Sequence, residues 1–231
     1  MVTILPRAPT QVERFYPETD GEPLAESDFQ REPLTYAVSA LRRYFEGRPD
    51  VYVSGNLFIY YLEGVPACVV APDVFVVFGV GNHDRAIYQV WEEGKAPDLV
   101  IEITSKKTRR KDEREKPRTY ARLKVKEYFQ YDPTGEYLVP ALKGRRLDAR
   151  GRYRPIAGRW LSGEVLALKS QVLGLELRLE EGRLRLFDPS EERYLLTYRE
   201  AEEARQKAEA RIRELEAEVA RLRGGRRGRT V

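Results

Sequence analysis

Two acidic residues stand beside or inside the most apolar stretches of the chain. Glu102 lies in the middle of Leu99–Thr104, and Asp73 directly precedes the apolar run Val74–Phe78. Both stretches are predicted strands, and the first is apolar enough to be buried on both faces. A buried carboxylate needs a cation, hydrogen bonds or a metal ion to offset the cost of leaving water. Two carboxylates on neighbouring strands are a minimal ligand set for a divalent cation.

A lysine follows Glu102 at a distance that suits a helix. Asp112, Lys116 and Tyr120 are four residues apart and would share one helical face, directed towards the end of the preceding strand. A lysine ammonium there could orient an attacking water or offset the charge on a phosphorane. Pro117 follows Lys116, and proline inside a helix costs about 3 kcal/mol unless it lies in the first turn. A helix that begins near Asp112 would instead make this residue a cap.

Basic residues concentrate around this lysine. The 231 residues include 41 Lys and Arg against 37 Asp and Glu, so the net charge is only +4. Residues 105–126 alone contain eleven Lys and Arg and three acids, a net charge of +8. Acids for a metal, a lysine and a basic flank are the parts that metal-dependent phosphodiester hydrolysis requires, because its substrate is negatively charged. The same basic segment could also be an ordinary solvated helix face.

Composition excludes several other chemistries. Cys68 is the only cysteine, so the chain can form no internal disulfide and no paired-cysteine site. His83 is the only histidine, so any metal rests mainly on carboxylates, which favours Mg²⁺ or Mn²⁺ over Zn²⁺. No GxSxG motif accompanies His83, and a serine triad is not expected. No run of about 18 apolar residues occurs, and we expect a cytoplasmic protein without a membrane partner.

The rest of the pattern predicts the elements that position these residues. Apolar residues at helical spacing predict a helix over residues 28–45. Residues 51–61 are predicted to form two strands joined by a turn at Ser54-Gly55-Asn56, and further strands are predicted at residues 68–71, 74–78, 99–104 and 127–131. Residues 137–188 alternate apolar and polar residues around glycines, which indicates short strands and hairpins, with one short helix near 163–173.

The order of the acidic, basic and aromatic residues resembles a known family. The similarity rests on Ala71-Pro72-Asp73, Ala96-Pro97-Asp98-Leu-Val-Ile-Glu102-Ile-Thr-Ser105, Thr108, Asp112, Lys116, Tyr120, Lys126-Glu-Tyr-Phe129 and Asp132-Pro133. This series is similar to the Uma family of endonucleases, in the PD-(D/E)XK restriction-endonuclease-like superfamily, and the likeness covers about residues 25–190. It implies an α/β (α+β) fold with a mixed central sheet flanked by helices. It also implies Mg²⁺ or Mn²⁺ as cofactor and nucleic acid as substrate, with DNA favoured over RNA.

The resemblance also implies roles for single residues. Asp73 matches the metal-binding acid of the central hairpin, Glu102 the acid of the following strand, and Lys116 a catalytic lysine displaced to the helix. Asp73 and Glu102 are therefore the expected metal ligands. Supporting contacts or substrate contacts are expected from Asp98, Asp112 and Tyr120.

One departure from the superfamily pattern keeps other functions open. The position two residues after Glu102, where the superfamily has lysine, is Thr104. An alternative to a metal-dependent endonuclease is therefore a module that keeps the nuclease fold and binds nucleic acid or a partner without cleaving. A third hypothesis is a scaffold whose C-terminal helix carries the function.

The chain divides into four predicted segments. They are an extended arm over 1–27, the nuclease domain over 28–190, a C-terminal helix over 191–223 and a disordered basic end over 224–231. Apolar residues in the third segment are spaced 3, 4, 4, 3, 4 and 3 apart, at Ala201, Ala204, Ala208, Ile212, Leu215, Val219 and Leu222. This approximates heptads with one irregular step, predicts a short coiled coil or a packing helix, and favours a homo-oligomer, preferably a dimer. Gly224-Gly225 is the predicted end of the helix.

Overall fold

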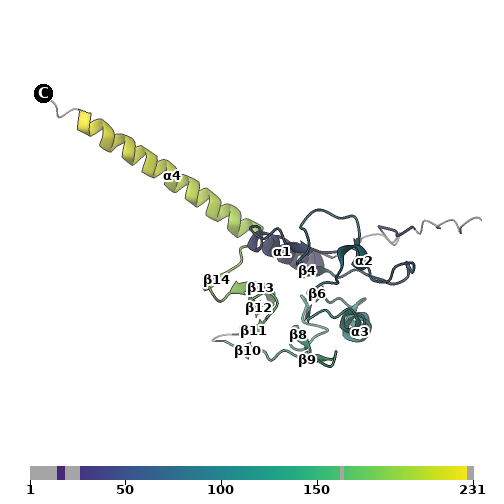
Figure 1. The fold of residues 1–231 in the computed structure, drawn as a ribbon. Coiled ribbons are helices and arrows are strands. Elements are labelled where there is room, and N and C mark those ends of the chain that lie inside the picture. Colours follow the sequence, from purple (N-terminus) through teal and green to yellow (C-terminus); the bar gives the residue numbers. More distant parts are fainter. Residues whose placement is uncertain (1–14, 19–26, 162–163, 228–231) are drawn as a thin grey trace, which may run out of the picture.

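The chain was analysed as a computed structural model that describes residues 15–18, 27–161 and 164–227, with side chains described up to Arg221. Its centre is a six-stranded sheet in the order β1-β4-β6-β7-β8-β9, of which Figure 1 labels β4, β6, β8 and β9. These strands are Val51–Ser54, Val74–Phe78, Leu99–Ile103, Glu127–Tyr131, Leu142–Leu147 and Tyr153–Pro155. β6 and β7 are parallel, and the other neighbours are antiparallel. The predicted mixed central sheet is therefore confirmed.

One face of the central sheet is covered by α1 (Asp28–Tyr44) and by a second sheet. The second sheet is an antiparallel meander of β10 to β14, namely Arg159–Trp160, Leu166–Lys169, Glu176–Glu180, Arg183–Asp188 and Arg193–Tyr194. Side chains from all three elements form one core, in which Leu41, Ile101 and Leu177 have no exposed surface. Apolar residues on a stripe of α1 pack here because this is the only way to remove that stripe from water. The predicted helix over 28–45 is thus confirmed.

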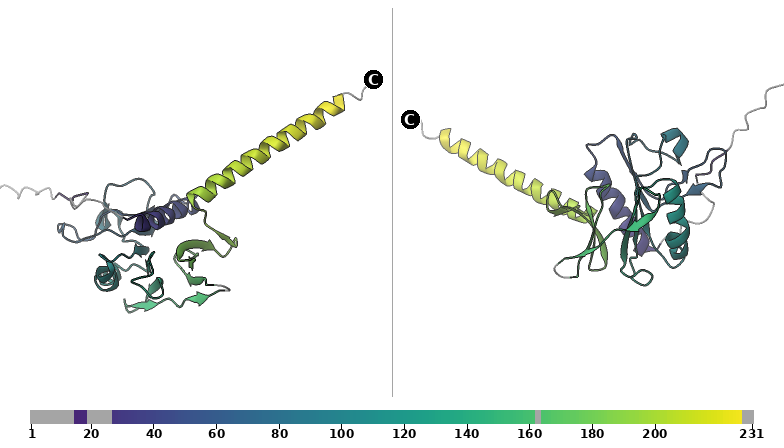
Figure 2. Two further views of the ribbon diagram at one scale, coloured as in Figure 1. Left: turned by 180° about the vertical axis from the view of Figure 1, so that it is seen from behind. Right: turned by 60° about the horizontal axis from the view of Figure 1, so that its bottom comes forward.

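The opposite face carries the elements that matter for the site. It is covered by a helical segment made of η1 (Lys111–Glu115) and α3 (Lys116–Arg122), and by a small sheet of β2 (Ile59–Tyr60), β3 (Val69–Val70) and β5 (Tyr88–Gln89). The short α2 (Val90–Glu93) follows β5. This second core is rich in aromatic side chains, which include Tyr88, Tyr120 and Tyr128. Figure 2 shows the layers from two further directions.

The η1–α3 segment forms the crossover between the parallel strands β6 and β7. Parallel neighbours cannot be joined by a tight turn, so the chain must pass over one face of the sheet. The segment starts with a reciprocal cap, in which Ser105 N–H donates to Thr108 Oγ1 at 3.1 Å and Thr108 N–H donates to Ser105 Oγ at 3.3 Å. The crossover therefore brings Lys116 back over the carboxyl end of β6, the usual side for ligand sites in such sheets.

Two sequence predictions differ from the observed elements. The short helix predicted near 163–173 is wrong, because Leu166–Lys169 forms β11, which pairs with β10 and β12. The local Leu-Ala-Leu-Lys sequence favours a helix, but pairing within the sheet overrides that preference. α4 spans Tyr198–Arg227 and thus continues past Gly224-Gly225, its predicted end. Glycine lowers helix stability by about 1 kcal/mol but does not forbid helical geometry.

The structure describes the remaining predicted segments only in part. Residues 191–197, predicted to belong to the C-terminal helix, contain β14 and the connection to α4. Most of the predicted arm over 1–27 and the last residues of the predicted basic end, 228–231, lie outside the described part of the chain. None of the helices in the described ranges is long and apolar enough to cross a membrane.

Candidate active site

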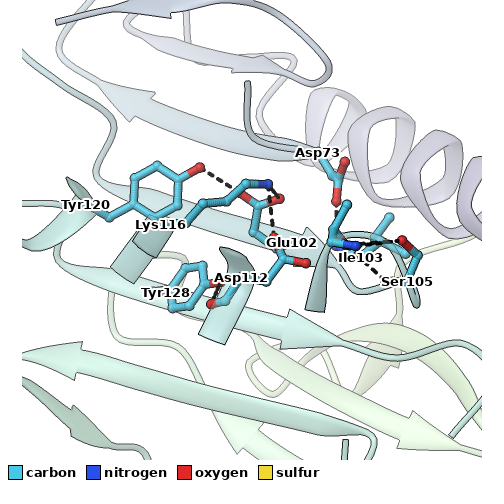
Figure 3. Close-up of polar contacts among 9 residues, drawn as sticks. Asp73, Glu102, Ile103, Ser105, Asp112, Lys116, Tyr120 and Tyr128 are labelled. Carbon is cyan, nitrogen blue, oxygen red and sulfur yellow. Dashed lines mark hydrogen bonds and ion pairs between the residues drawn. The ribbon is translucent and has the colours of Figure 1, made fainter. Parts of the chain in front are cut away.

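Glu102 is the centre of a buried polar cluster. It lies on β6, has no exposed surface and is one of five consecutive buried residues in that strand. Both carboxylate oxygens are engaged: Tyr120 Oη donates to Oε1 at 2.6 Å, and Lys116 Nζ lies 2.7 Å from Oε2 (Figure 3). The crossover segment therefore supplies both partners of this strand residue. Glu102, Lys116 and Tyr120 therefore lie close together, as their spacing in the sequence predicts.

Asp112 completes the surroundings of the lysine. Its Oδ1 lies 3.1 Å from Lys116 Nζ, so the ammonium stands between two carboxylates. The Asp112 side chain is 1% exposed, and its Oδ2 has no hydrogen-bond partner in the described part of the chain. Asp112 is thus not a helix cap but a buried acid that faces the cluster. A buried carboxylate oxygen without a donor is a position at which a cation or water would be stabilised.

Asp73 joins the cluster from the neighbouring strand. Val74 of β4 pairs with Ile101 of β6, so one step further places Asp73 opposite Glu102. The Asp73 Oδ2 atom accepts a 2.6 Å hydrogen bond from the backbone N–H of Ile103. Cross-strand partners in an antiparallel pair project from the same face of the sheet. The two acids chosen from the sequence therefore stand side by side.

The geometry of η1 explains how Lys116 reaches Glu102 although Pro117 follows it. Lys116 N–H donates to the carbonyl of Lys111 five residues back, which widens this turn into a π-helix. Pro117 lies in the first turn of α3 and has no hydrogen to donate to the Asp112 carbonyl. Tyr128 Oη of β7 donates to that carbonyl instead, at 2.6 Å. A side chain of the sheet thus replaces the missing backbone donor and holds the π turn in place.

The cluster has too little positive charge for its acids. Burial raises the pKa of Glu102 and Lys116 lowers it, but the charges of Asp73 and Asp112 raise it again, to about 8. Burial likewise raises the pKa of Asp73, against the lowering by Lys116 and by the Ile103 N–H. Burial lowers the pKa of Lys116, but the charges of Glu102, Asp112 and Asp73 outweigh it, so the pKa is raised. Lys116 is therefore a permanently charged donor and no proton acceptor.

The acids present fit a hard divalent cation. The described residues contain no group of three or more His, Cys, Asp or Glu arranged to hold a metal ion. Mg²⁺, however, is usually bound by only one or two carboxylates and completes its coordination with waters and substrate phosphates. Asp73 and Glu102 supply such a pair, the unpartnered Asp112 Oδ2 lies nearby, and the raised pKa values indicate a shortage of positive charge. The donor set contains oxygen only, which suits Mg²⁺ or Mn²⁺.

Asp98 is a predicted site residue that the structure places elsewhere. It stands before the other end of β6, four residues or about 13 Å from Glu102 along the strand. Its Oδ2 accepts hydrogen bonds from the backbone N–H of Phe78 and from Lys95 Nζ, both at 2.8 Å, and its Oδ1 lies 2.8 Å from Lys126 Nζ. Burial raises the pKa of Asp98, but these partners outweigh it and lower the value. Asp98 thus helps to hold β4, β6 and β7 together through these hydrogen bonds and ion pairs.

Gln130 belongs to the cluster and was missed from the sequence. It pairs in register with Glu102 on the parallel strand β7, so its side chain leaves the same face of the sheet. It is 1% exposed, and neither Nε2 nor Oε1 has a hydrogen-bond partner in the described structure. The buried Thr104 Oγ1 has no hydrogen-bond partner among the described residues either. An amide inside the apolar strand Glu-Tyr-Phe-Gln-Tyr was a detectable signal, of the same kind as the acid in β6.

The basic segment lies next to this cluster. Ten of the eleven Lys and Arg side chains in residues 105–126 are exposed, and Lys116 is the one that is not. The segment begins directly after β6, so its first basic residues follow the end of the strand that carries Glu102. A positive surface of this kind attracts polyanions, and the attraction is strongest at low salt.

Comparison with known proteins assigns the chain to a family. Residues 11–180 match the Uma2 family, described as "Putative restriction endonuclease". Curated proteins give no match. A solved structure described as a "putative nuclease belonging to DUF820 from Anabaena variabilis" is 11% identical, with a TM-score of 0.46 over 68% of this chain and 81% of that chain. Because the family match spans well over half of the sequence, the chain belongs to the Uma2 family.

Proposed function

We propose that the protein is a metal-dependent endonuclease that hydrolyses phosphodiester bonds in nucleic acid, with DNA as the favoured substrate. The observation that carries this proposal is the arrangement around Glu102. Two acids from adjacent strands, Asp73 and Glu102, stand beside a charged lysine 2.7 Å from Glu102, at the edge of a strongly basic surface. Membership of a restriction-endonuclease family supports the same reaction class.

Each residue has a distinct task in this reaction. Asp73 and Glu102 would hold Mg²⁺ or Mn²⁺. The cation, when bound, supplies Lewis-acid activation of the phosphate and favours ionisation of water. Lys116 keeps its charge, so it donates to a phosphate oxygen or to the attacking water and offsets the charge that develops on phosphorus. Burial and the nearby Glu102 raise the pKa of Tyr120 well above its usual value, so its hydroxyl stays a donor that fixes the Glu102 carboxylate.

The exposed basic side chains of residues 105–126 provide the affinity for the substrate backbone. Contacts to phosphates position a nucleic acid without reading its sequence. We therefore assign this segment to substrate binding, and the buried cluster to cleavage. The missing lysine at position 104 does not oppose cleavage in this scheme, because Lys116 brings its ammonium to Glu102 from the crossover segment.

Cleavage of labelled single-stranded and double-stranded DNA and RNA, with Mg²⁺, Mn²⁺ or EDTA, tests the proposal. We expect cleavage that requires the metal and falls by at least about 100-fold, the usual scale for loss of a catalytic group, in Glu102→Gln and Asp73→Asn. Glu176→Gln is the matched control, because Glu176 is also a buried, ion-paired glutamate but lies in the second sheet.

Binding of Mn²⁺, measured by calorimetry, provides a second readout that does not depend on cleavage. Both site variants should lose this binding, and Glu176→Gln should keep it. Binding of nucleic acid without cleavage of any substrate under either metal would refute the endonuclease proposal and favour a binding module with the same fold.

A further inference from the structure

α4 leaves the globular part of the protein without packing against it. Every described side chain from Glu203 to Arg221 is exposed, and the helix projects away from both sheets in all views (Figures 1 and 2). Its 30 residues correspond to a length of about 45 Å. In most proteins a helix is stabilised by packing one apolar face, so a long helix without such contacts calls for a partner or for many internal ion pairs.

The first turn of α4 is nevertheless fixed to the body. Thr197 N–H donates to Glu200 Oε2 at 2.8 Å, and Glu200 N–H donates to Thr197 Oγ1 at 3.2 Å, which together form a capping box. Arg185 of β13 holds the same glutamate with two hydrogen bonds of 3.1 Å. The base of the helix is therefore anchored, and whatever binds its outer part is placed at a defined position relative to the candidate active site.

The outer half of α4 exposes an apolar stripe. Ile212, Leu215 and Val219 are 54%, 43% and 44% exposed, and together with Glu216 and Ala220 they line a shallow surface hollow. Their spacing of three and four residues keeps them on one side of the helix. Large aliphatic side chains in such a row on a helix surrounded by water mark an interaction surface.

We propose that α4 pairs with α4 of a second copy of this chain as a parallel, in-register, two-stranded coiled coil. The heptad pattern is uninterrupted when Arg205, and not Ala204, is assigned to the seam. This pattern supports the proposal. The a positions are then Tyr198, Arg205, Ile212 and Val219, and the d positions are Ala201, Ala208, Leu215 and Leu222. β-Branched residues at a with leucine at d, as the outer heptads have, favour two parallel strands over three or four.

Arg205 restricts the number of strands further. Its guanidinium pairs with Glu202 at 2.6 Å and also with Glu209 of the same helix, and both glutamates occupy e positions at the border of the seam. In a two-stranded coil an a-position arginine can keep these partners and remain hydrated. In a three- or four-stranded bundle it would be enclosed, which is costly for a charge.

The charges beside the seam select a second copy in parallel orientation. In a parallel dimer each g residue faces the e residue five positions later on the other helix. Arg211 at g then meets Glu216 of the second copy, and the sequence gives Glu218 and Arg223 the same relation with the signs exchanged. An antiparallel pair would instead bring e positions together, and three of the four, Glu202, Glu209 and Glu216, are acidic.

The mass of the full-length protein, determined by light scattering after size exclusion, is the first test. We expect twice the chain mass of 26.8 kDa for the native sequence and the single-chain mass for Leu215→Glu, which places a charge in the seam. Arg213→Glu is the control, because position 213 is a b position that points away from the seam. A monomer at all concentrations would show a single, self-supporting helix and overturn the proposal.

Disulfide cross-linking tests orientation and register. In a Cys68→Ser background, Ala208→Cys and Val219→Cys should each give a covalent dimer on oxidation, whereas Ala210→Cys at an outward f position should not. Two self-linking positions eleven residues apart require parallel helices in register, because an antiparallel pair can bring only one point of a helix opposite itself. Cross-linking at one of the two positions alone, or at neither, would contradict the proposed arrangement.

A charge exchange tests the contact between copies directly. Arg211→Glu and Glu216→Arg should each weaken the homodimer, because each creates two like-charged pairs. An equimolar mixture of the two variants should form a heterodimer as stable as the native dimer, since both pairs are then attractive again. No preference for the heterodimer would exclude this register. None of these outcomes depends on cleavage, so the proposal stands or falls independently of the endonuclease function.

Discussion

At the scale of single residues, the fold buries Glu102 in surroundings where ionisation of its carboxyl group is unfavourable. Burial and two neighbouring acids raise the pKa of this carboxyl group to about 8, although Lys116 lies only 2.7 Å away. Functional sites commonly contain groups that the fold would be more stable without. A cation bound between the acids, as proposed above, would remove this cost, so the feature that weakens the metal-free protein would favour metal binding.

Glu102→Gln should therefore stabilise the metal-free protein, and more so at high pH. Between the unfolded pKa of about 4.3 and the folded value of about 8, the native protein binds more protons at Glu102 than the unfolded chain does, so the free energy of unfolding falls as pH rises. Glutamine has no such dependence. In EDTA, the Tm of the variant should match that of the native protein at pH 5 and exceed it by at least about 3 °C at pH 8. A lower Tm at pH 8 would contradict this.

Gln130 is another buried polar side chain whose burial costs stability, but it carries no charge. Its buried amide has no hydrogen-bond partner among the described residues, and such a group costs about 1–3 kcal/mol. Gln130→Leu should raise the free energy of unfolding by about 1 kcal/mol in urea denaturation and lower the cleavage rate, since a donor beside Glu102 is lost. Gln89→Leu on the small sheet is the control for a general effect of the substitution. Unchanged cleavage would show that Gln130 has no role at the site.

The sequence showed which residues are unusual for their surroundings better than it showed which residues they contact. Asp73 and Glu102 were visible because an acid in an apolar strand needs an explanation, and the structure places them opposite each other. Gln130 has the same property but was overlooked because an amide is less conspicuous than an acid. Asp98 was included because it belongs to the block of residues that resembles the family, yet a strand separates it from Glu102 by about 13 Å. Spacing along a strand gives the face but not the partners.

At the scale of elements, the site depends on the irregular crossover between β6 and β7. The regular strands and α1 were predictable from their apolar patterns. The π turn of η1 was not, because it arises from the Lys111 carbonyl bonding to Lys116 and from the Tyr128 hydroxyl bonding to the Asp112 carbonyl. These contacts join segments that are distant in the sequence. Sequence reasoning therefore saw Pro117 as an obstacle, whereas the fold uses it to start α3.

Tyr128→Phe should loosen this turn and so misplace Lys116. Loss of the hydrogen bond leaves a buried carbonyl without a donor, which should lower the free energy of unfolding by about 1–2 kcal/mol. The cleavage rate should fall at least about 10-fold, while Mn²⁺ affinity stays within about twofold, because Asp73 and Glu102 do not move. Tyr153→Phe is a close control, because its hydroxyl also donates to a backbone carbonyl, that of Val125, at 2.8 Å. It should lose stability without losing cleavage.

At the scale of the whole molecule, charge and shape divide the protein into parts with different tasks. The central sheet, the η1–α3 segment and the small sheet enclose the buried cluster, the basic segment over 105–126 begins beside it, and α4 extends away from both sheets. The modest net charge of +4 conceals this division, because acids elsewhere balance the local +8. The pattern of charge along the sequence predicted the basic surface, and the heptads predicted the helix. The first turn of α4 could not be predicted in the same way, because the ion pair that anchors it joins Arg185 of the second sheet to Glu200 of the helix.

The basic segment should determine how nucleic-acid binding responds to salt. Each phosphate neutralised by a side chain contributes about 0.9 to the slope of log affinity against log salt concentration on duplex DNA. Neutralising Lys106, Lys107, Arg109 and Arg110, all exposed, should reduce that slope by up to about 3.6 if each contacts one phosphate. Fluorescence anisotropy between 50 and 200 mM salt, on Glu102→Gln protein in EDTA so that no cleavage interferes, gives the slope.

The matched control removes an equal charge from other exposed positions, at Arg183, Arg193, Arg199 and Lys207. This variant should keep the native slope, because these residues lie on the second sheet and on α4. Equal reductions in the two variants would mean that DNA is attracted by the net charge alone, and the surface next to Glu102 would lose its role in binding the substrate. A reduction confined to the first variant would place the phosphate backbone beside the buried cluster, as cleavage requires.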